Sequence, residues 1–205
     1  MAASGGGGSA VSFIAGTTTT KLLWPESSIP STFTICSVTR YTGGTRRRIL
    51  TCLGSPSQAA NWLHGHLISM RGVAYYANGL QTSYANHGVL DDWLVMCGTN
   101  AGATAPGNII LDQDEIGTAD GGVGSCRLNI GYFQPSDWAL HSVLIWDYSL
   151  GTVSALWHTW QPYRRFCCHG SVHGVIEGCV ELFSQGRVTG GVDTVETRTV
   201  VRPGG

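Results

Sequence analysis

Apolar and polar residues alternate along several short segments of the chain, and the clearest of these spans residues 138–146. In an extended backbone, Leu140 and the following even-numbered residues up to Trp146 would share one side, and His141, Val143 and Ile145 the other. A strict period of two over this length predicts a β-strand that is buried on at least one face. Several such segments in one chain indicate antiparallel sheets rather than helices.

Shorter segments rich in β-branched and aromatic residues predict further strands, with glycine and aspartate in the turns between them. They span residues 12–14, 33–39, 48–53, 61–66, 73–76, 92–97, 108–111, 115–118 and 127–132. Three hairpins are expected: 33–39 with 48–53, 61–66 with 73–76, and 108–111 with 115–118. Near the end of the patterned region, residues 149–160 predict one short helix, with Leu150, Val153, Leu156 and Trp157 on its buried face.

The composition agrees with an all-β chain. Of the 205 residues, 29 are glycine and only 12% are charged, whereas about 25% are charged in an average soluble domain. Long amphipathic helices need a charged face, so this composition favours short strands joined by tight turns. We expect a flexible lead-in at residues 1–10, one antiparallel β-sandwich at 11–160, and a C-terminal extension of uncertain order at 161–205.

Charge and cysteine content narrow the classes of partner. The formal net charge of -1 gives no general attraction to nucleic acid, and no apolar run reaches the roughly 18 residues needed to span a bilayer. We therefore expect neither nucleic-acid binding nor membrane insertion. The basic run 46–48 is interpreted as a turn entering the next strand. Cys36, Cys52 and Cys97 lie in apolar runs and are predicted to be buried, with disulfide pairing left open.

The order of the strand motifs is more informative than any one of them. The chain reads Phe-Thr-Ile-x-x-Val-x-Arg-Tyr at 33–41, Asn-Trp-Leu-His-Gly-His at 61–66 and Ile-Leu-Asp-x-x-x-Ile-Gly-Thr at 110–118. It closes with Ser-Asp-Trp-Ala-x-x-x-Val-Leu-Ile-Trp-Asp-x-x-Leu at 136–150. Over residues 11–160 this order resembles the laminin-G-like branch of the concanavalin A-like lectin/glucanase superfamily. The closing motif is the most specific part of the resemblance.

The resemblance implies a concanavalin A-like jelly-roll sandwich that recognises a glycan or a protein partner in adhesion, and some family members bind calcium at the sandwich rim. It favours an extracellular or cell-surface location, although no secretory signal is visible at the start of this sequence. The chain departs from the family at Gly151, where an acidic pair is usual, and at the turn 112–114, which lacks the usual glycine.

Aromatic and histidine side chains on one predicted strand and the loop after the next are the candidates for ligand contact. Trp62, His64 and His66 share one face, so the indole could stack on a sugar ring while the imidazoles hydrogen-bond its hydroxyls. Alternatively Trp62 fills the core, or the two histidines contribute to a transition-metal site. The candidate ligand-binding residues are Trp62, His64, His66, Tyr76, Tyr84, Asn86 and His87.

A cluster of acidic residues near the predicted hairpin turn raises the hypothesis of calcium binding. Asp112, Asp114 and Asp120 could supply hard oxygen ligands. Aspartate is also a common turn former, so a plain hairpin turn is the alternative.

The sequence lacks the residue pattern of the glucanases in the same superfamily. A retaining glycosidase needs two carboxylates roughly 5 Å apart, and the family motif Glu-x-Asp-x-x-Glu does not occur. We therefore expect a non-catalytic module that binds a glycan or a protein. The alternatives are a structural domain that assembles a larger protein, and a divergent glycoside hydrolase that uses Asp91, Asp92 or Glu115.

Overall fold

The chain folds into β-strands throughout the part that the structure describes. The computed structural model describes residues 11–53, 61–77, 80, 82–83, 85–100, 109–112, 114–117, 122–149, 180–181, 187–188 and 196–200. The strands are β1 (Val11–Gly16), β2 (Leu22–Leu23), β3 (Thr34–Tyr41), β4 (Leu50–Leu53), β5 (Trp62–Leu67), β6 (Met70–Tyr76), β7 (Leu94–Thr99), β8 (Ile109–Leu111), β9 (Asp114–Gly117), β10 (Arg127–Ile130), β11 (Trp138–Trp146), β12 (Val180–Glu181), β13 (Arg187–Val188) and β14 (Glu196–Val200). The all-β prediction is confirmed, and the helix expected at 149–160 lies, from residue 150 onward, outside the described residues.

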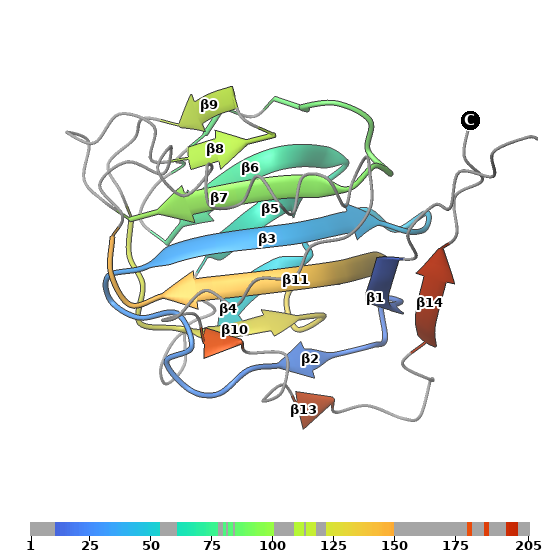
Figure 1. Cartoon of the computed structure of the whole chain (residues 1–205), viewed down its shortest axis with the longest axis horizontal. Helices are drawn as coiled ribbons and strands as arrows, with labels where there is room; N and C mark the ends of the chain where they lie inside the picture. The colour runs from blue at the N-terminus through green and yellow to red at the C-terminus, as the bar shows by residue number, and fades with distance from the viewer. Residues whose placement is uncertain are drawn as a thin grey trace, which may run out of the picture.

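The strands form two antiparallel sheets that lie one behind the other (Figure 1). The larger sheet has the order β14-β1-β11-β3-β7-β8-β9, and β12 pairs with β11 off this path. The smaller sheet has the order β13-β2-β10-β4-β5-β6. Strands that follow one another in sequence often lie in opposite sheets, so the chain crosses repeatedly between the two layers.

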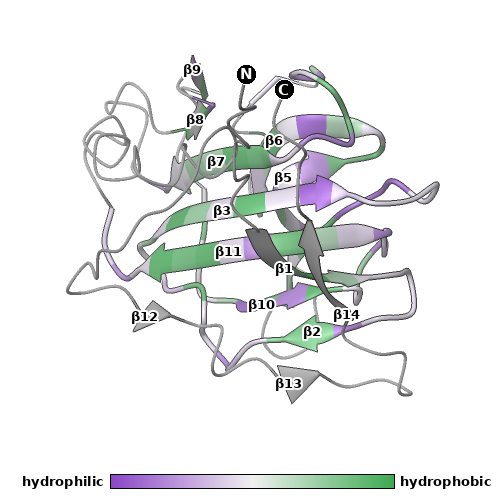
Figure 2. Cartoon of the chain, turned by 45° about the vertical axis from the view of Figure 1, so that its right-hand side comes forward, coloured by the Kyte–Doolittle hydropathy of each residue, from purple (hydrophilic) through white to green (hydrophobic). Residues whose placement is uncertain are grey.

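Apolar side chains from both sheets fill the space between the layers. The larger sheet contributes, among others, Ile35, Met96, Leu140 and Ile145, and the smaller sheet contributes Leu50, Trp62, Tyr76, Leu128 and Ile130. Figure 2 shows hydrophobic colouring along much of β7 and β11. Removal of this apolar surface from water, at about 25 cal/mol per Å², is the main force that holds the sheets together.

Strand β11 lies in the interior of the larger sheet, and its apolar alternation predicted a strand that is buried on at least one face. It pairs with β1 on one side and β3 on the other. The pairing register shifts between Leu140 and Ser142, so His141 is the extra residue of a β-bulge. An extra residue reverses the side on which the following side chains point. Val143, and not Leu144, therefore joins Leu140 in the core, which corrects the expectation of one unbroken alternation.

Two of the three expected hairpins are present, and the third prediction was wrong. β5 pairs with β6, and β8 pairs with β9. β3, however, lies in the larger sheet and β4 in the smaller one. Residues 42–49 therefore cross from one layer to the other instead of closing a hairpin. Alternation identified both strands, but it carries no information on which strand pairs with which.

Each sheet contains a disulfide bond between neighbouring strands. Cys36 on β3 is bonded to Cys97 on β7, and Cys52 on β4 is bonded to Cys126, which directly precedes β10. All four cysteines are buried. Burial was predicted for Cys36, Cys52 and Cys97, and the disulfide pairing was left open. The bonded residues are 61 and 74 positions apart, so each bond restricts a long loop of the unfolded chain and contributes about 2–4 kcal/mol.

Short strands from the C-terminal part of the chain add to both sheets. β14 pairs with β1 and β12 with β11 in the larger sheet, and β13 pairs with β2 in the smaller one. These described parts of residues 161–205 therefore continue the two sheets. Among the described residues, no helix has the length and apolar character needed to cross a bilayer.

Candidate functional site

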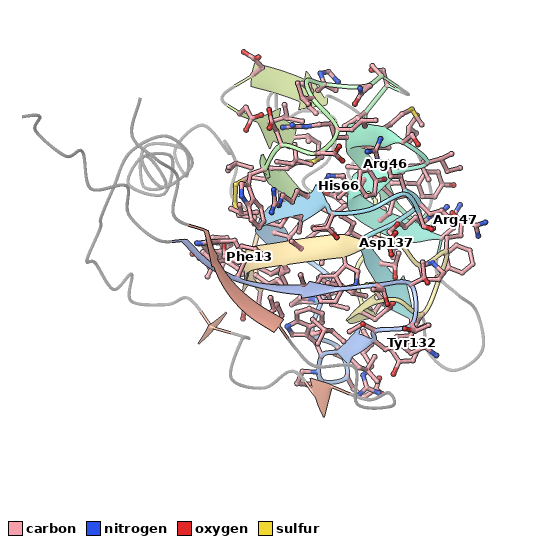
Figure 3. The ribbon with its side chains drawn as sticks, turned by 90° about the vertical axis from the view of Figure 1, so that its right-hand side faces the viewer. Phe13, Arg46, Arg47, His66, Tyr132 and Asp137 are labelled. Carbon is pink, nitrogen blue, oxygen red and sulfur yellow. A yellow bond between two sulfur atoms is a disulfide. The ribbon has the colours of Figure 1, made fainter. Side chains whose placement is uncertain are left out.

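Turns from both sheets meet at one end of the structure. Strands β1 and β3 finish there, beside the start of β11, because Gly16 and Tyr41 both pair with Trp138. The crossing segment 42–49 and the β5–β6 turn lie at the same end, joined by hydrogen bonds between their backbones. We call this end the loop rim and define it as residues 17–21, 42–49, 68–69, 86–93, 112 and 131–137. Figure 3 shows this end with Arg46, Arg47, Tyr132 and Asp137 labelled.

Asp137 fixes the crossing segment to the start of β11. Its side-chain Oδ2 accepts a hydrogen bond from the Thr45 amide at 2.9 Å. Its backbone carbonyl accepts from the Thr42 amide, and its own amide donates to the Thr45 carbonyl. A Cβ atom at Gly43 would lie 2.6 Å from the same Oδ2, so this close approach requires glycine. The segment 42–45 is therefore held in one conformation.

The amide and the carbonyl of Arg47 are both hydrogen-bonded, while its side chain is exposed. The amide donates to Ser136 Oγ at 2.7 Å, and the carbonyl accepts from the Tyr41 hydroxyl and the Ile68 amide. Burial raises the pKa of Tyr41, so this hydroxyl stays protonated and can donate. Ile68 and Ser69 both have positive φ, as a two-residue turn between paired strands requires.

The loop rim presents positive charge next to aromatic carbon. Arg46 forms an ion pair with Asp91 at 2.8 Å, and both side chains are partly exposed. The Lys21 ammonium lies 5.1 Å from the centroid of the Tyr132 ring. Together with the exposed Arg47, these groups place hydrogen-bond donors and an aromatic ring at the loop rim.

Arg71 is the buried centre of the neighbouring part of the rim. Its guanidinium donates to the carbonyls of Val89 at 2.7 Å, Asp92 at 3.5 Å and Trp93 at 3.2 Å. It also pairs with Asp112 Oδ2 at 3.0 Å, and only 4% of the Arg71 side chain is exposed. One cation therefore joins β6, the loop 86–93 and the β8–β9 turn.

The proposed calcium ligands do not come together as a set in the described residues. Asp112 bonds to Arg71 through Oδ2 and accepts from the Val95 amide through Oδ1 at 3.4 Å. Asp114 is exposed, and Asp120 lies outside the described residues. In the described part of the chain, no three histidine, cysteine or acidic side chains are grouped so that they could hold a metal ion.

Asn86 and His87 lie in the loop rim, as part of the segment that surrounds Arg71. Asn86 is exposed, but its Oδ1 accepts from the Arg71 amide and its Nδ2 donates to the Gly88 carbonyl, both at 3.2 Å. The His87 amide donates to the Arg71 carbonyl. Both residues therefore help to shape the rim, and Tyr84, the third candidate of this loop, lies outside the described residues.

The four candidates on β5 and β6 lie in the core between the sheets. Trp62, His64 and His66 share one face, as predicted, but that face points inward, and all three are 0% exposed, as is Tyr76. The rings of Trp62 and Tyr76 stack with centroids 5.2 Å apart. This placement supports the alternative that Trp62 fills the core, and it corrects the hypothesis of a ligand-facing row.

The two buried histidines are neutral at physiological pH. His64 Nε2 donates to the Met96 carbonyl at 3.2 Å, which leaves Nδ1 to accept from the Tyr76 hydroxyl at 2.9 Å. Burial lowers the pKa of His64 to about 4. Burial, with a smaller contribution from the nearby Arg71 charge, lowers the pKa of His66 to about 3. Both rings act as uncharged core residues.

Arg71 and Arg47 are the residues of this site that sequence reasoning missed. Arg71 stands in an otherwise apolar strand and is followed by Gly72. A lone charge in an apolar strand is a usable signal, because a buried charge must have partners. Arg47 gave no comparable signal, since a basic triplet beside a turn is usually solvated.

Comparison with known proteins adds no family to this geometry. No protein-family model matches the chain, and no curated protein matches it.

Proposed function

We propose that the chain is a non-catalytic binding module whose loop rim recognises a glycan, with a protein ligand as the second possibility. We further propose that its two sheets form a jelly roll of the laminin-G-like kind. The crossing of the chain between layers after β3 and the position of β1 beside β11 support this topology. The observation that carries the functional proposal is the hydrogen-bonded backbone under the exposed Arg47.

A rim of this kind suits recognition because its main chain is ordered before a ligand arrives. Ordering loops and side chains on binding reduces affinity, so a pre-organised surface binds more tightly for the same contacts. Arg47 can donate to the hydroxyl or carboxylate oxygens of a sugar. The Tyr132 ring, with the Lys21 ammonium over one of its faces, supplies the kind of aromatic contact that a sugar ring can pack against.

The test is a glycan array and a pull-down with the full chain, comparing wild type with Arg47→Ala. This substitution keeps the backbone hydrogen bonds of residue 47, so the rim should keep its shape. We expect binding to weaken at least about fivefold, equivalent to about 1 kcal/mol. Arg127→Ala is the control, because Arg127 pairs with Glu26 at the start of β10, away from the rim. No ligand in either screen, or equal binding by Arg47→Ala, would refute the proposal.

A structural role in a larger assembly is the second candidate. It is favoured by the pairing of β13 and β14 onto strands of both sheets, since segments that add at sheet edges can also join separate units. Removal of residues 161–205 should then change the oligomeric state in size-exclusion chromatography, and the full chain should bind no glycan.

We also propose that the protein functions in an oxidising compartment, such as the cell exterior. Two buried disulfides, one in each sheet, support this location, because such bonds persist mainly outside the reducing cytosol.

A further inference from the structure

We propose that Arg71 is a built-in cation that takes the place of calcium at the loop rim, so that the rim keeps its shape without a metal ion. Some members of the family that the chain resembles bind calcium at the sandwich rim, and Asp112 is one of the three residues expected to bind it here, together with Asp114 and Asp120. In this chain the oxygen atoms around Asp112 already contact the positively charged guanidinium of Arg71.

The surroundings of the Arg71 guanidinium resemble a calcium site in chemistry. Three backbone carbonyls of the loop 86–93 and one carboxylate approach the group at 2.7–3.5 Å. Calcium prefers this mixture of carbonyl and carboxylate oxygens. The planar guanidinium satisfies the same oxygens through directed N–H bonds, and its charge does not depend on pH or on ion concentration.

Two glycines near the Arg71 side chain have a positive φ, which favours glycine over other residues. Gly88 has a φ of 82°, and a Cβ atom there would lie 3.6 Å from the guanidinium carbon. Gly72 has a φ of 86°, and a Cβ atom there would lie 2.4 Å from Leu111 and 2.8 Å from the His87 ring. Both positions therefore favour glycine, and the strand, the loop and the turn can close around the arginine.

A divalent ion has no place beside this arginine. Asp112 uses one carboxylate oxygen for the guanidinium and the other for the Val95 amide. Bringing calcium to Asp112 would put two positive centres next to each other in a partly buried site, where repulsion is weakly screened. The rim of the wild-type chain therefore excludes calcium at this position.

The main experiment measures the melting temperature of the full chain in chelator and in about 10 mM calcium chloride, well above the ~1 mM dissociation constant of weak extracellular sites. Magnesium chloride at the same concentration controls for ionic strength. We expect the wild-type melting temperature to agree within about 1 °C under the three conditions, because a ligand raises it only by binding the native state.

The variant Arg71→Ala tests the proposal through a gain of calcium response. Loss of the guanidinium removes the positive charge that the three carbonyls and Asp112 Oδ2 contact, so this variant should melt well below wild type and regain about 3 °C in calcium but not in magnesium. The double variant Arg71→Ala/Asp112→Asn should lose the calcium response. Arg127→Ala, which removes an arginine from a different ion pair, should show none.

The outcomes separate cleanly. A calcium-dependent rise for wild type that Asp112→Asn abolishes would overturn the proposal, and so would an Arg71→Ala variant that folds but gains nothing from calcium. If Arg71→Ala does not fold, Arg71→Lys keeps the charge and should remain insensitive to calcium. The corollary that rim ligands bind equally in calcium and in chelator rests on the proposed binding function. The melting experiment does not, so the two can fail separately.

Discussion

The core and the loop rim both bury polar side chains, but they do so in opposite ways. Between the sheets, His64 and His66 are uncharged, with pKa values lowered to about 4 and about 3. At the rim, the Arg71 side chain is only 4% exposed, and four oxygen atoms contact its guanidinium. The core therefore buries neutral side chains, whereas the rim buries a cation together with its oxygen partners.

This difference shows how a small sandwich can keep its stability and its recognition surface apart. Imidazoles tolerate an apolar interior by staying neutral, which makes the core sensitive to acid. A buried arginine needs oxygen partners for its charged guanidinium, and here they come from separate loops that close around it. The two regions should therefore respond to different perturbations.

Acidification should produce the largest effect, and it should act on the core. The folded pKa values of His64 and His66 lie below the unfolded value of about 6.5, so the unfolded state binds more protons as the pH falls. Stability is then fully present above about pH 6.5 and is lost as the pH falls towards the folded pKa values. At pH 5 each histidine should cost about 2 kcal/mol relative to pH 7.

Urea unfolding at pH 7 and pH 5, analysed at equal ionic strength, measures this loss of about 4 kcal/mol. Imidazole nitrogen chemical shifts at pH 5 provide the control, since they should still report neutral rings. Equal stability at the two pH values, or rings that titrate near pH 6.5, would mean that the two regions do not differ as proposed.

A smaller effect is expected at the rim itself, from removal of its carboxylate clamp. Asp137→Ala leaves the Thr45 amide without the acceptor that it has at 2.9 Å, so we expect a loss of about 1–2 kcal/mol in the free energy of unfolding. Amide hydrogen exchange should also speed up at Thr45. Asp147→Ala, which removes an exposed carboxylate at the far end of β11, should change neither measurement.

The sequence predicted the strands well because each one repeats apolar positions with a period of two. That signal is local, and it located β3, β7, β11 and the β5–β6 and β8–β9 hairpins within a few residues. Partner choice depends on contacts between distant segments, so the crossing from β3 to β4 could not be read from the pattern. The bulge at His141 could not be predicted for a similar reason, because it is defined by the pairing of β11 with the distant strand β3.

The site was harder to predict than the fold because burial on both faces of a strand removes the contrast that alternation depends on. All six residues of β5 are buried, so Trp62 and the two histidines gave no sign of which side faces solvent. Arg71 draws its partners from two distant segments, the loop 86–93 and Asp112. Their sequence separation gave no indication that they meet around one guanidinium.

The smallest effect should come from the exposed ion pair of the rim, and it separates charge from burial. Arg46 and Asp91 are 2.8 Å apart, a shorter contact than the 3.0 Å between Arg71 and Asp112. The Arg46 side chain is 30% exposed, whereas that of Arg71 is 4% exposed. Water and salt screen the exposed pair, so a double-mutant cycle of Arg46→Ala and Asp91→Ala should give a coupling of less than about 1 kcal/mol that falls further in high salt. The same cycle at Arg71 and Asp112 should give a larger and salt-resistant coupling. If the two cycles gave the same coupling, distance rather than the oxygen surroundings of Arg71 would set the strength of the rim.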